Sequence, residues 1–142
     1  ISLACLQAHE IDQLEEKNFD LVIINSVIQC FHGHNYLRGV LSKILSLMSD
    51  NGYLFIGDVM DRDSRVAMEN DMKAFELEHR GSGFKTKTDF TQELFISRDF
   101  FTDMLIEFPR FQSAEYSGKA YTVENELTRY RYDVVLTVNL LD

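Results

Sequence analysis

Hydrophobic residues fall into short continuous runs and helically spaced stripes along this chain. The run at residues 19–25 is apolar and rich in β-branched side chains, which is typical of a strand buried on both faces of a parallel sheet. Residues 36–48 carry apolar side chains at a spacing that predicts a helix. Residues 53–56 form a second apolar run. A strand, a helix and a strand in this order predict a right-handed βαβ unit.

The flanking segments predict further strands and helices around this unit. Residues 1–6 are apolar and compatible with a strand, and residues 64–79 and 98–108 have helical periodicity. The tail, residues 111–121 and 130–138, predicts two strands of an antiparallel hairpin. The predicted fold class is therefore α/β, with one domain or part of one.

Polar residues mark the expected ends of these helices. The acidic stretch 10–16 predicts a loop with a helical turn. The Ser-Asp-Asn-Gly stretch at residues 49–52 follows the first helix, and such residues tolerate the left-handed conformation that often ends a helix. Ser97 is a favourable N-cap for the last helix, which Pro109 ends.

Composition and charge narrow the class of protein. The 142 residues are enough for one domain with a real core, and 45% hydrophobic with 26% charged residues is typical of globular proteins. The net charge of −9 disfavours nucleic acids and anionic membranes as partners, and no apolar run could span a bilayer. Cys5 and Cys30 lack metal-binding spacing, so we expect reduced cysteines, at least one buried, in a cytoplasmic protein.

Three segments resemble one protein family in the same order and spacing. FDLVIINSVIQCF at residues 19–31 resembles a fourth-strand pattern, INSVxQYF, with Cys30 in the tyrosine position. NGYLFIGDV at residues 51–59 is similar to a fifth-strand pattern, GGxxFIGDV. NELTRYRYDVVL at residues 125–136 is close to the terminal pattern NELTRFRYDVVL. The family is the class I S-adenosylmethionine-dependent methyltransferase domain that is embedded in nonribosomal peptide synthetases.

The resemblance covers nearly the whole chain and implies the second half of a Rossmann-like fold. Methyltransferases of this class have a Gly-rich loop after their first strand and an acidic residue that holds the ribose hydroxyls, as dinucleotide-binding folds do. This sequence has no such glycine cluster, and residues 1–6 correspond to the family's third strand. We therefore expect residues 1–142 to be a single partial methyltransferase domain, inactive alone, whose parent uses S-adenosylmethionine.

The resemblance places cofactor-binding residues in two segments. Glu10, with Ile11 beside it, corresponds to an acidic residue that accepts a hydrogen bond from the adenine amino group; the alternative is an exposed loop glutamate. Asn25, Ser26 and Val27 leave the C-terminal end of a predicted parallel strand, where open α/β sheets bind ligands. We expect them to line the adenosyl and sulfonium region; Asn25 or Ser26 could also cap a helix, and the two roles are compatible.

Three further residues are candidates for the substrate side. Gln29 cannot take a proton, but its carbonyl oxygen can orient an amine, and N-methylation needs mainly in-line alignment; a structural hydrogen bond is the alternative. Asp58 ends the second predicted strand and could pair with a substrate ammonium or cap the following segment. His32 is a candidate base, and its spacing from His34 does not predict a metal site.

The C-terminal segment alternates arginines with tyrosines. Because successive strand residues point to opposite faces, we expect Tyr130 and Tyr132 to face one side and Arg131 the other. Pairing of this arginine with Glu126 or Asp133 would anchor the terminal hairpin. We expect a structural role there rather than contact with substrate.

The resemblance implies methyl transfer from S-adenosylmethionine to the α-amine of an aminoacyl thioester on a carrier protein, beside other synthetase domains, in peptide-antibiotic biosynthesis. Two alternatives stay open. A small-molecule O- or C-methyltransferase would need a proton acceptor at the position of Gln29, and a non-catalytic docking element would need none of this chemistry.

The predicted strand at residues 19–25 has an apolar edge that needs a partner. Without a first strand beside it, its long apolar edge would be an aggregation hazard. We expect either that residues 1–6 cover this edge or that two chains pair there as a dimer.

Overall fold

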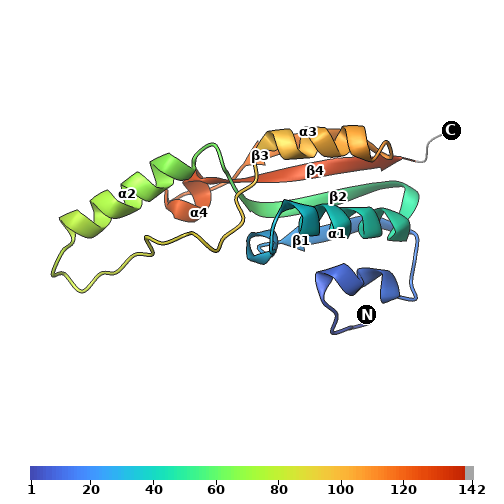
Figure 1. The fold of residues 1–142 in the computed structure, drawn as a ribbon, viewed down its shortest axis with the longest axis horizontal. Coiled ribbons are helices and arrows are strands. Elements are labelled where there is room, and N and C mark those ends of the chain that lie inside the picture. Colours follow the sequence, from blue (N-terminus) through green and yellow to red (C-terminus); the bar gives the residue numbers. More distant parts are fainter. Residues whose placement is uncertain (140–142) are drawn as a thin grey trace.

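The computed structural model describes residues 1–139, which form a four-stranded mixed sheet with helices packed on it (Figure 1). The strand order is β1-β2-β4-β3. β1 (Phe19–Asn25) is parallel to β2 (Met48–Met60), while β4 (Arg131–Asn139) is antiparallel to both β2 and β3 (Phe111–Gly118). α1 (His34–Leu47) connects β1 to β2. The parallel strand–helix–strand unit and the terminal antiparallel strand pair are thus confirmed.

The other helices are η1 (Ala8–Gln13), η2 (Ile28–Cys30), α2 (Arg65–Glu78), α3 (Arg98–Glu107) and α4 (Glu126–Arg129). Two of them, α2 and α3, lie where the hydrophobic pattern predicts them, with ends that differ by one residue, whereas the short helices η2 and α4 were not predicted. Ser97 is the N-cap residue of α3, as predicted, although its side chain makes no capping hydrogen bond. The helical turn expected in the acidic stretch is the 3-10 helix η1.

Two local predictions are wrong. Residues 1–6 form no strand, and Ile1 and Leu3 are exposed to solvent; an apolar segment becomes a strand only where a neighbouring strand takes up its backbone hydrogen bonds. Residues 49–52 do not adopt a left-handed turn. The chain passes directly from α1 into β2 because Met48 is already extended and pairs with Phe19 of β1.

α1 and α3 cover the same face of the sheet. Arg38 on α1 forms an ion pair with Glu107 on α3, with 2.6 Å between Nε and Oε2, and its guanidinium lies over the ring of Phe100. Burial of each large apolar side chain contributes about 1.5–3 kcal/mol. The main core beneath the two helices includes Leu37, Leu41, Ile44, Leu54, Ile56, Phe101, Met104, Val134 and Leu136.

The opposite face of β1 and β2 is open to solvent. Leu21 and Ile23 are 53% and 61% exposed, and Tyr53, which pairs with Leu21, is 55% exposed. The prediction that the first strand is buried on both faces is therefore wrong. Within residues 1–139, β1 pairs with β2 alone and lies at the edge of the sheet.

α2 and residues 79–95 form an arm that extends beyond the sheet (Figure 1). A second, smaller core holds this arm against the ends of β2 and β4; its members are Met60, Met68, Phe90, Phe95 and Tyr130. The arm follows β2 directly, so its base lies at the C-terminal ends of the parallel strands. Open α/β sheets bind their ligands at this edge.

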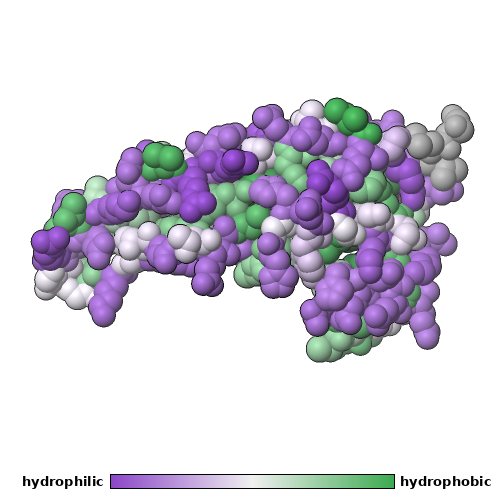
Figure 2. Space-filling view, viewed as in Figure 1, coloured by the Kyte–Doolittle hydropathy of each residue, from purple (hydrophilic) through white to green (hydrophobic). Residues whose placement is uncertain are grey.

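The surface in view in Figure 2 is mainly hydrophilic. Cys5 and Cys30 are both free and exposed, so the prediction that one is buried is wrong. Of the helices within residues 1–139, none has the length and apolar character needed to cross a bilayer.

Candidate functional site

The C-terminal ends of β1 and β2 bring several of the predicted site residues together. The Ser26 backbone N–H donates a 3.2 Å hydrogen bond to the carbonyl of Gly57 on β2. The Ser26 hydroxyl donates to Oδ2 of Asp58. Gln29 folds back from η2, and its Nε2 donates to the Ser26 carbonyl at 2.9 Å. The parallel pairing of two strands therefore joins residues that are about thirty positions apart.

The backbone at this edge has an uncommon conformation. Ser26 and Asp58 have positive φ angles of 56° and 59°, a region that residues other than glycine rarely adopt. Asp58 lies where the register between β2 and β4 shifts, between Ile56 and Val59. Strained residues and strand irregularities are concentrated at functional sites. The conformation thus marks the same strand ends as the side chains do.

Gly57 allows the two strand ends to approach. A Cβ at this position would lie 2.0 Å from Oδ1 of Asn25, so only glycine lets the Asn25 side chain lie against β2. The Asn25 amide in turn donates to the Ser26 hydroxyl at 3.3 Å. Sequence reasoning noted this glycine only as part of a motif. Its structural role depends on the register between β1 and β2.

Asp58 has a cationic partner that the sequence did not indicate. Nζ of Lys119, which follows β3, lies 2.7 Å from Oδ1 of Asp58 and 2.8 Å from Oδ1 of Asp133. The Asp58 backbone N–H also donates to Asp133 at 2.9 Å. Asp61 rather than Asp58 holds the start of α2, because its carboxylate accepts from the Ser64 hydroxyl at 3.0 Å.

The ion pair shifts the titration of both partners. Partial burial acts to raise the pKa of the Asp58 carboxyl, but hydrogen bonds from Lys119 and Ser26 outweigh it and hold that pKa below its usual value. Burial acts to lower the pKa of Lys119, but hydrogen bonds to Asp133 and Asp58 raise it overall. Asp58 is thus a carboxylate at neutral pH, and it holds Ser26 in place.

Glu10 and Ile11, the predicted adenine-side residues, lie in η1. Oε2 of Glu10 accepts a 3.0 Å hydrogen bond from the backbone N–H of Gln7, which caps the start of this helix. Ile11 packs against the main core. The glutamate thus has a structural hydrogen bond, and its second carboxylate oxygen is a further acceptor.

Tyr36 joins η1 to the turn after β1. Its hydroxyl is hydrogen-bonded to Nδ1 of His9 at 3.0 Å, and the ring of His32 packs edge-on against it with centroids 5.5 Å apart. His34 contacts Phe100 instead, so the two histidines have different neighbours. In the described part of the chain, no three His, Cys, Asp or Glu side chains gather to hold a metal ion.

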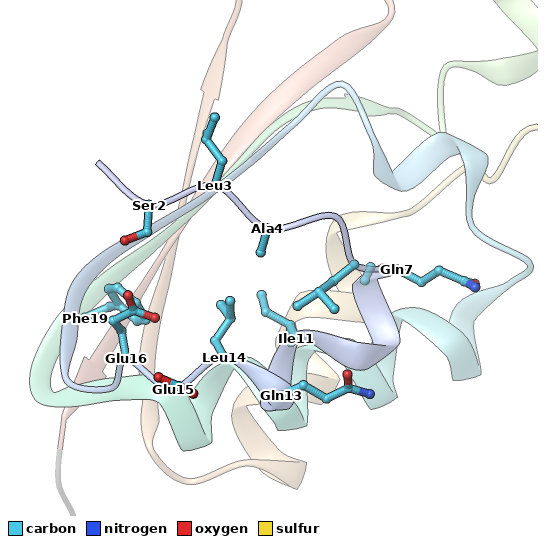
Figure 3. Close-up of a pocket in the computed structure, with 12 residues that line it drawn as sticks. Ser2, Leu3, Ala4, Gln7, Ile11, Gln13, Leu14, Glu15, Glu16 and Phe19 are labelled. Carbon is cyan, nitrogen blue, oxygen red and sulfur yellow. The ribbon is translucent and has the colours of Figure 1, made fainter.

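An apolar hollow lies between the N-terminal segment and η1 (Figure 3). It has a volume of about 870 Å³, and its lining includes Leu3, Ala4, Ile11 and Leu14. Ile11 is the one predicted site residue among its lining residues. The polar groups that could direct chemistry are at the strand ends, and we place the candidate site there.

Known proteins with a similar sequence include nonribosomal peptide synthetases. No protein-family model matches the chain. Its sequence is 37% identical over 135 residues to the nonribosomal peptide synthetase CymA of Salinispora arenicola, a match that covers 94% of this chain and 2% of the synthetase. It is 31% identical over 130 residues to the chondramide synthase of Chondromyces crocatus, covering 84% and 3%. The chain therefore spans a few per cent of the length of these relatives.

Several solved structures with the same fold are methyltransferases. The magnesium protoporphyrin IX methyltransferase of Synechocystis, solved with S-adenosylhomocysteine bound, aligns with a TM-score of 0.53 at 18% identity, over 91% of this chain and 48% of that one. A methyltransferase from Methanosarcina mazei aligns with a TM-score of 0.57 at 11% identity, over 96% and 66%. At these identities the likeness shows the fold alone.

The chain thus has the truncated Rossmann-like fold of class I S-adenosylmethionine-dependent methyltransferases. Its sequence is homologous to a segment of nonribosomal peptide synthetases. The three motifs indicate a resemblance to the C-terminal part of a methyltransferase domain embedded in such synthetases. Together these findings confirm that resemblance.

Proposed function

We propose that this chain is the substrate-side part of a methyltransferase that transfers a methyl group from S-adenosylmethionine to the α-amine of an aminoacyl thioester held on a carrier protein. One combined observation carries the proposal. The chain has a sequence similar to peptide synthetases and the fold of methyltransferases, and the amide of Gln29 lies at the turn after β1. An amide suits an amine substrate because it orients N–H groups without taking a proton.

The residues at the end of β1 fit a place beside the cofactor. Asn25, Ser26 and Val27 are exposed at the ligand edge of the sheet, and the absence of a side chain on Gly57 lets Asn25 lie across the strand pair. We assign these three residues to the adenosyl and sulfonium region, and Glu10 with Ile11 to the adenine. The bound cofactor would supply an electrophilic methyl group.

This chain's own residues would align the amine. The hydrogen bond from Nε2 of Gln29 to the Ser26 carbonyl fixes the amide plane, so Oε1 is held as an acceptor for a substrate N–H. Asp58 forms an ion pair with Lys119 and positions Ser26 through a hydrogen bond. A neutral amine is already nucleophilic, and alignment of two reactants removes up to about 7–11 kcal/mol of the barrier.

The test is methyl transfer by the natural full-length polypeptide, measured with S-adenosylmethionine labelled in its methyl group and an aminoacyl-loaded carrier protein. We expect label on the α-nitrogen of the released amino acid. Gln29→Ala should lower kcat about a hundredfold, the cost of a small misplacement of reactants. The matched control Gln92→Ala changes an exposed glutamine of the arm and should leave the rate unchanged.

Two outcomes would contradict the proposal. Label on oxygen or carbon would point to the O- or C-methyltransferase alternative. No transfer to any aminoacyl thioester, from a folded full-length polypeptide, would favour a docking element.

A further inference from the structure

A second cavity lies between the strand ends and the arm. It has a volume of about 360 Å³, at the small end of the range of about 300–1,000 Å³ that ligand pockets occupy. We call it the Met60 cavity; its lining residues are Gln29, Cys30, Met60, Met72, Thr86, Lys87, Phe90, Glu93, Glu126 and Arg131. Gln29 belongs both to this cavity and to the candidate site, so the two adjoin.

Hydrogen bonds fix the cavity walls to the sheet. The backbone N–H of Leu94 donates to the carbonyl of Gln29 at 2.9 Å, and that of Ile96 donates to Met60 at 2.9 Å. Met60 and Phe90 are buried in the smaller core, and Met72 packs against it. The apolar part of the lining therefore consists of two methionines and a phenylalanine.

Two residues of this lining each have an acceptor oxygen without a hydrogen-bond partner in the described part of the chain. Oε1 of Gln29 and Oε2 of Glu93 are both shielded from solvent, and neither has a partner within residues 1–139. Buried polar atoms are almost always paired. Two residues that line one cavity and that each carry an unpaired acceptor point to a ligand that brings N–H or O–H donors.

The charged groups of the cavity neutralise one another. Nζ of Lys87 pairs with Oε1 of Glu93, and Arg131 makes hydrogen bonds of 3.1 Å from both Nε and Nη2 to Oε1 of Glu126. With two cations and two carboxylates in pairs, the lining has no net charge that would select an ion. An uncharged donor with an apolar body suits this lining best.

We propose that the Met60 cavity binds the amino acid of the substrate, with an apolar side chain against Met60, Met72 and Phe90. Oε1 of Gln29 and Oε2 of Glu93 each accept one N–H of the neutral primary amine. The assignment rests on the proposed function and adds Glu93 as a substrate-binding residue. It also predicts the substrate class, an acyl group with an apolar side chain and a primary amine.

Two acceptors for two N–H groups leave the nitrogen lone pair free. Transfer then forms the bond from nitrogen to the methyl carbon and breaks the carbon–sulfur bond of the sulfonium, whose electron pair stays on sulfur. The nitrogen afterwards loses one proton, and the Glu93 carboxylate is the adjoining acceptor. The product is a secondary amine with one N–H, so it can donate a hydrogen bond to only one of the two acceptors.

Methionine signals report occupancy of the cavity directly. The 142-residue chain is labelled with ¹³C on its methionine methyl groups and titrated with the N-acetylcysteamine thioester of L-valine above about pH 8, where an α-amine is mainly neutral. We expect the signals of Met60 and Met72 to shift and those of Met48 and Met104, in the main core, to stay. The N,N-dimethylated probe, which has no N–H, should bind about tenfold more weakly.

Variants separate Glu93 from its ion pair. Glu93→Gln should weaken binding of the valine probe about tenfold, the usual effect of losing a charge-assisted hydrogen bond. Lys87→Met breaks the same ion pair but keeps the carboxylate, so it should bind the probe at least as tightly as the natural chain. Unchanged Met48 and Met104 signals show that each variant is folded.

These binding experiments test the cavity assignment separately from the proposed methyl transfer. Unmoved Met60 and Met72 signals, or equal affinity for the dimethylated probe, would overturn the cavity assignment even if the full-length polypeptide methylates amines. Shifts as expected, with no methyl transfer by the full-length polypeptide, would support the cavity and contradict the proposed function.

Discussion

Side chains at the ends of β1 and β2 hold one another in place. Ser26, Asp58 and Gln29 come together because parallel strands place their C-terminal ends at one edge, and the sequence predicted this from strand order. The ion pair between Lys119 and Asp58 was not predicted, because Lys119 follows β3 in the antiparallel part of the sheet. Its contact depends on the register of β4, which carries Asp133.

Lys119→Met should destabilise the fold at pH 7 by about 1–3 kcal/mol, because it leaves two partly buried carboxylates unpaired. The pKa of Asp58 is lowered on folding, so its stabilisation is present above its unfolded pKa and is lost as the pH falls through the folded value. The difference between variant and natural chain should therefore hold at neutral pH and shrink below about pH 4.

Urea unfolding at several pH values measures this difference. Lys85→Met is the matched control, because Lys85 is exposed and forms no ion pair within residues 1–139. A difference that stays constant down to pH 3 would contradict the assigned ion pair.

The arm shows how weakly one element is attached to the rest. Met68 is the only fully buried residue of α2, so packing of this helix depends on the smaller core. The helical periodicity of α2 predicted its existence and approximate bounds. Its position beyond the sheet was not predictable, because few apolar side chains specify where a polar helix packs.

Met68→Ala should release α2 while the sheet stays folded. Truncation of a buried methionine costs about 2–5 kcal/mol, and we expect the loss to be local because α2 does not contribute to the main core. Hydrogen exchange of residues 65–78 should rise strongly, with α3 and β4 unchanged. Val66→Ala, at a side chain 70% exposed on the same helix, should change nothing. Equal loss of protection in α3 would show that arm and sheet unfold as one unit.

At the scale of the whole molecule, one face of β1 and β2 and the free edge of β1 are open within residues 1–139. Residues 1–6 leave the edge of β1 uncovered, so the first of the two expected solutions is wrong. Leu21, Ile23 and Tyr53 form an exposed apolar area beside that edge. Exposed apolar edge strands pair with other chains, which leaves dimerisation as the remaining prediction.

We expect the 142-residue chain to be a dimer at micromolar concentration, measured by light scattering during gel filtration. Ile23→Lys should shift it to the monomer, because a charged side chain on an edge strand opposes pairing. Val66→Lys adds the same charge on α2, away from the edge, and should leave the dimer intact. A natural chain that stays monomeric at all concentrations would refute this prediction.

The isolated 142-residue chain should bind S-adenosylmethionine more weakly than micromolar. The backbone amides of a glycine-rich loop and a carboxylate for the ribose hydroxyls supply much of the binding in such folds, and the glycines of this chain form no such loop. Calorimetric titration measures the affinity. A micromolar dissociation constant would show that the residues at the end of β1 suffice.

The sequence by itself determined the main strands and helices from residue 19 onward, their order and the resemblance to one family, because hydrophobic periodicity and three motifs are local properties. It also predicted that the arginine–tyrosine alternation anchors the terminal segment, and Arg131 does pair with Glu126 while Tyr130 and Tyr132 are buried. Only the tertiary structure decided which strand face stays exposed, which cation meets Asp58, and that Glu93 and Gln29 share a cavity. These features depend on contacts between distant residues, which no local pattern encodes.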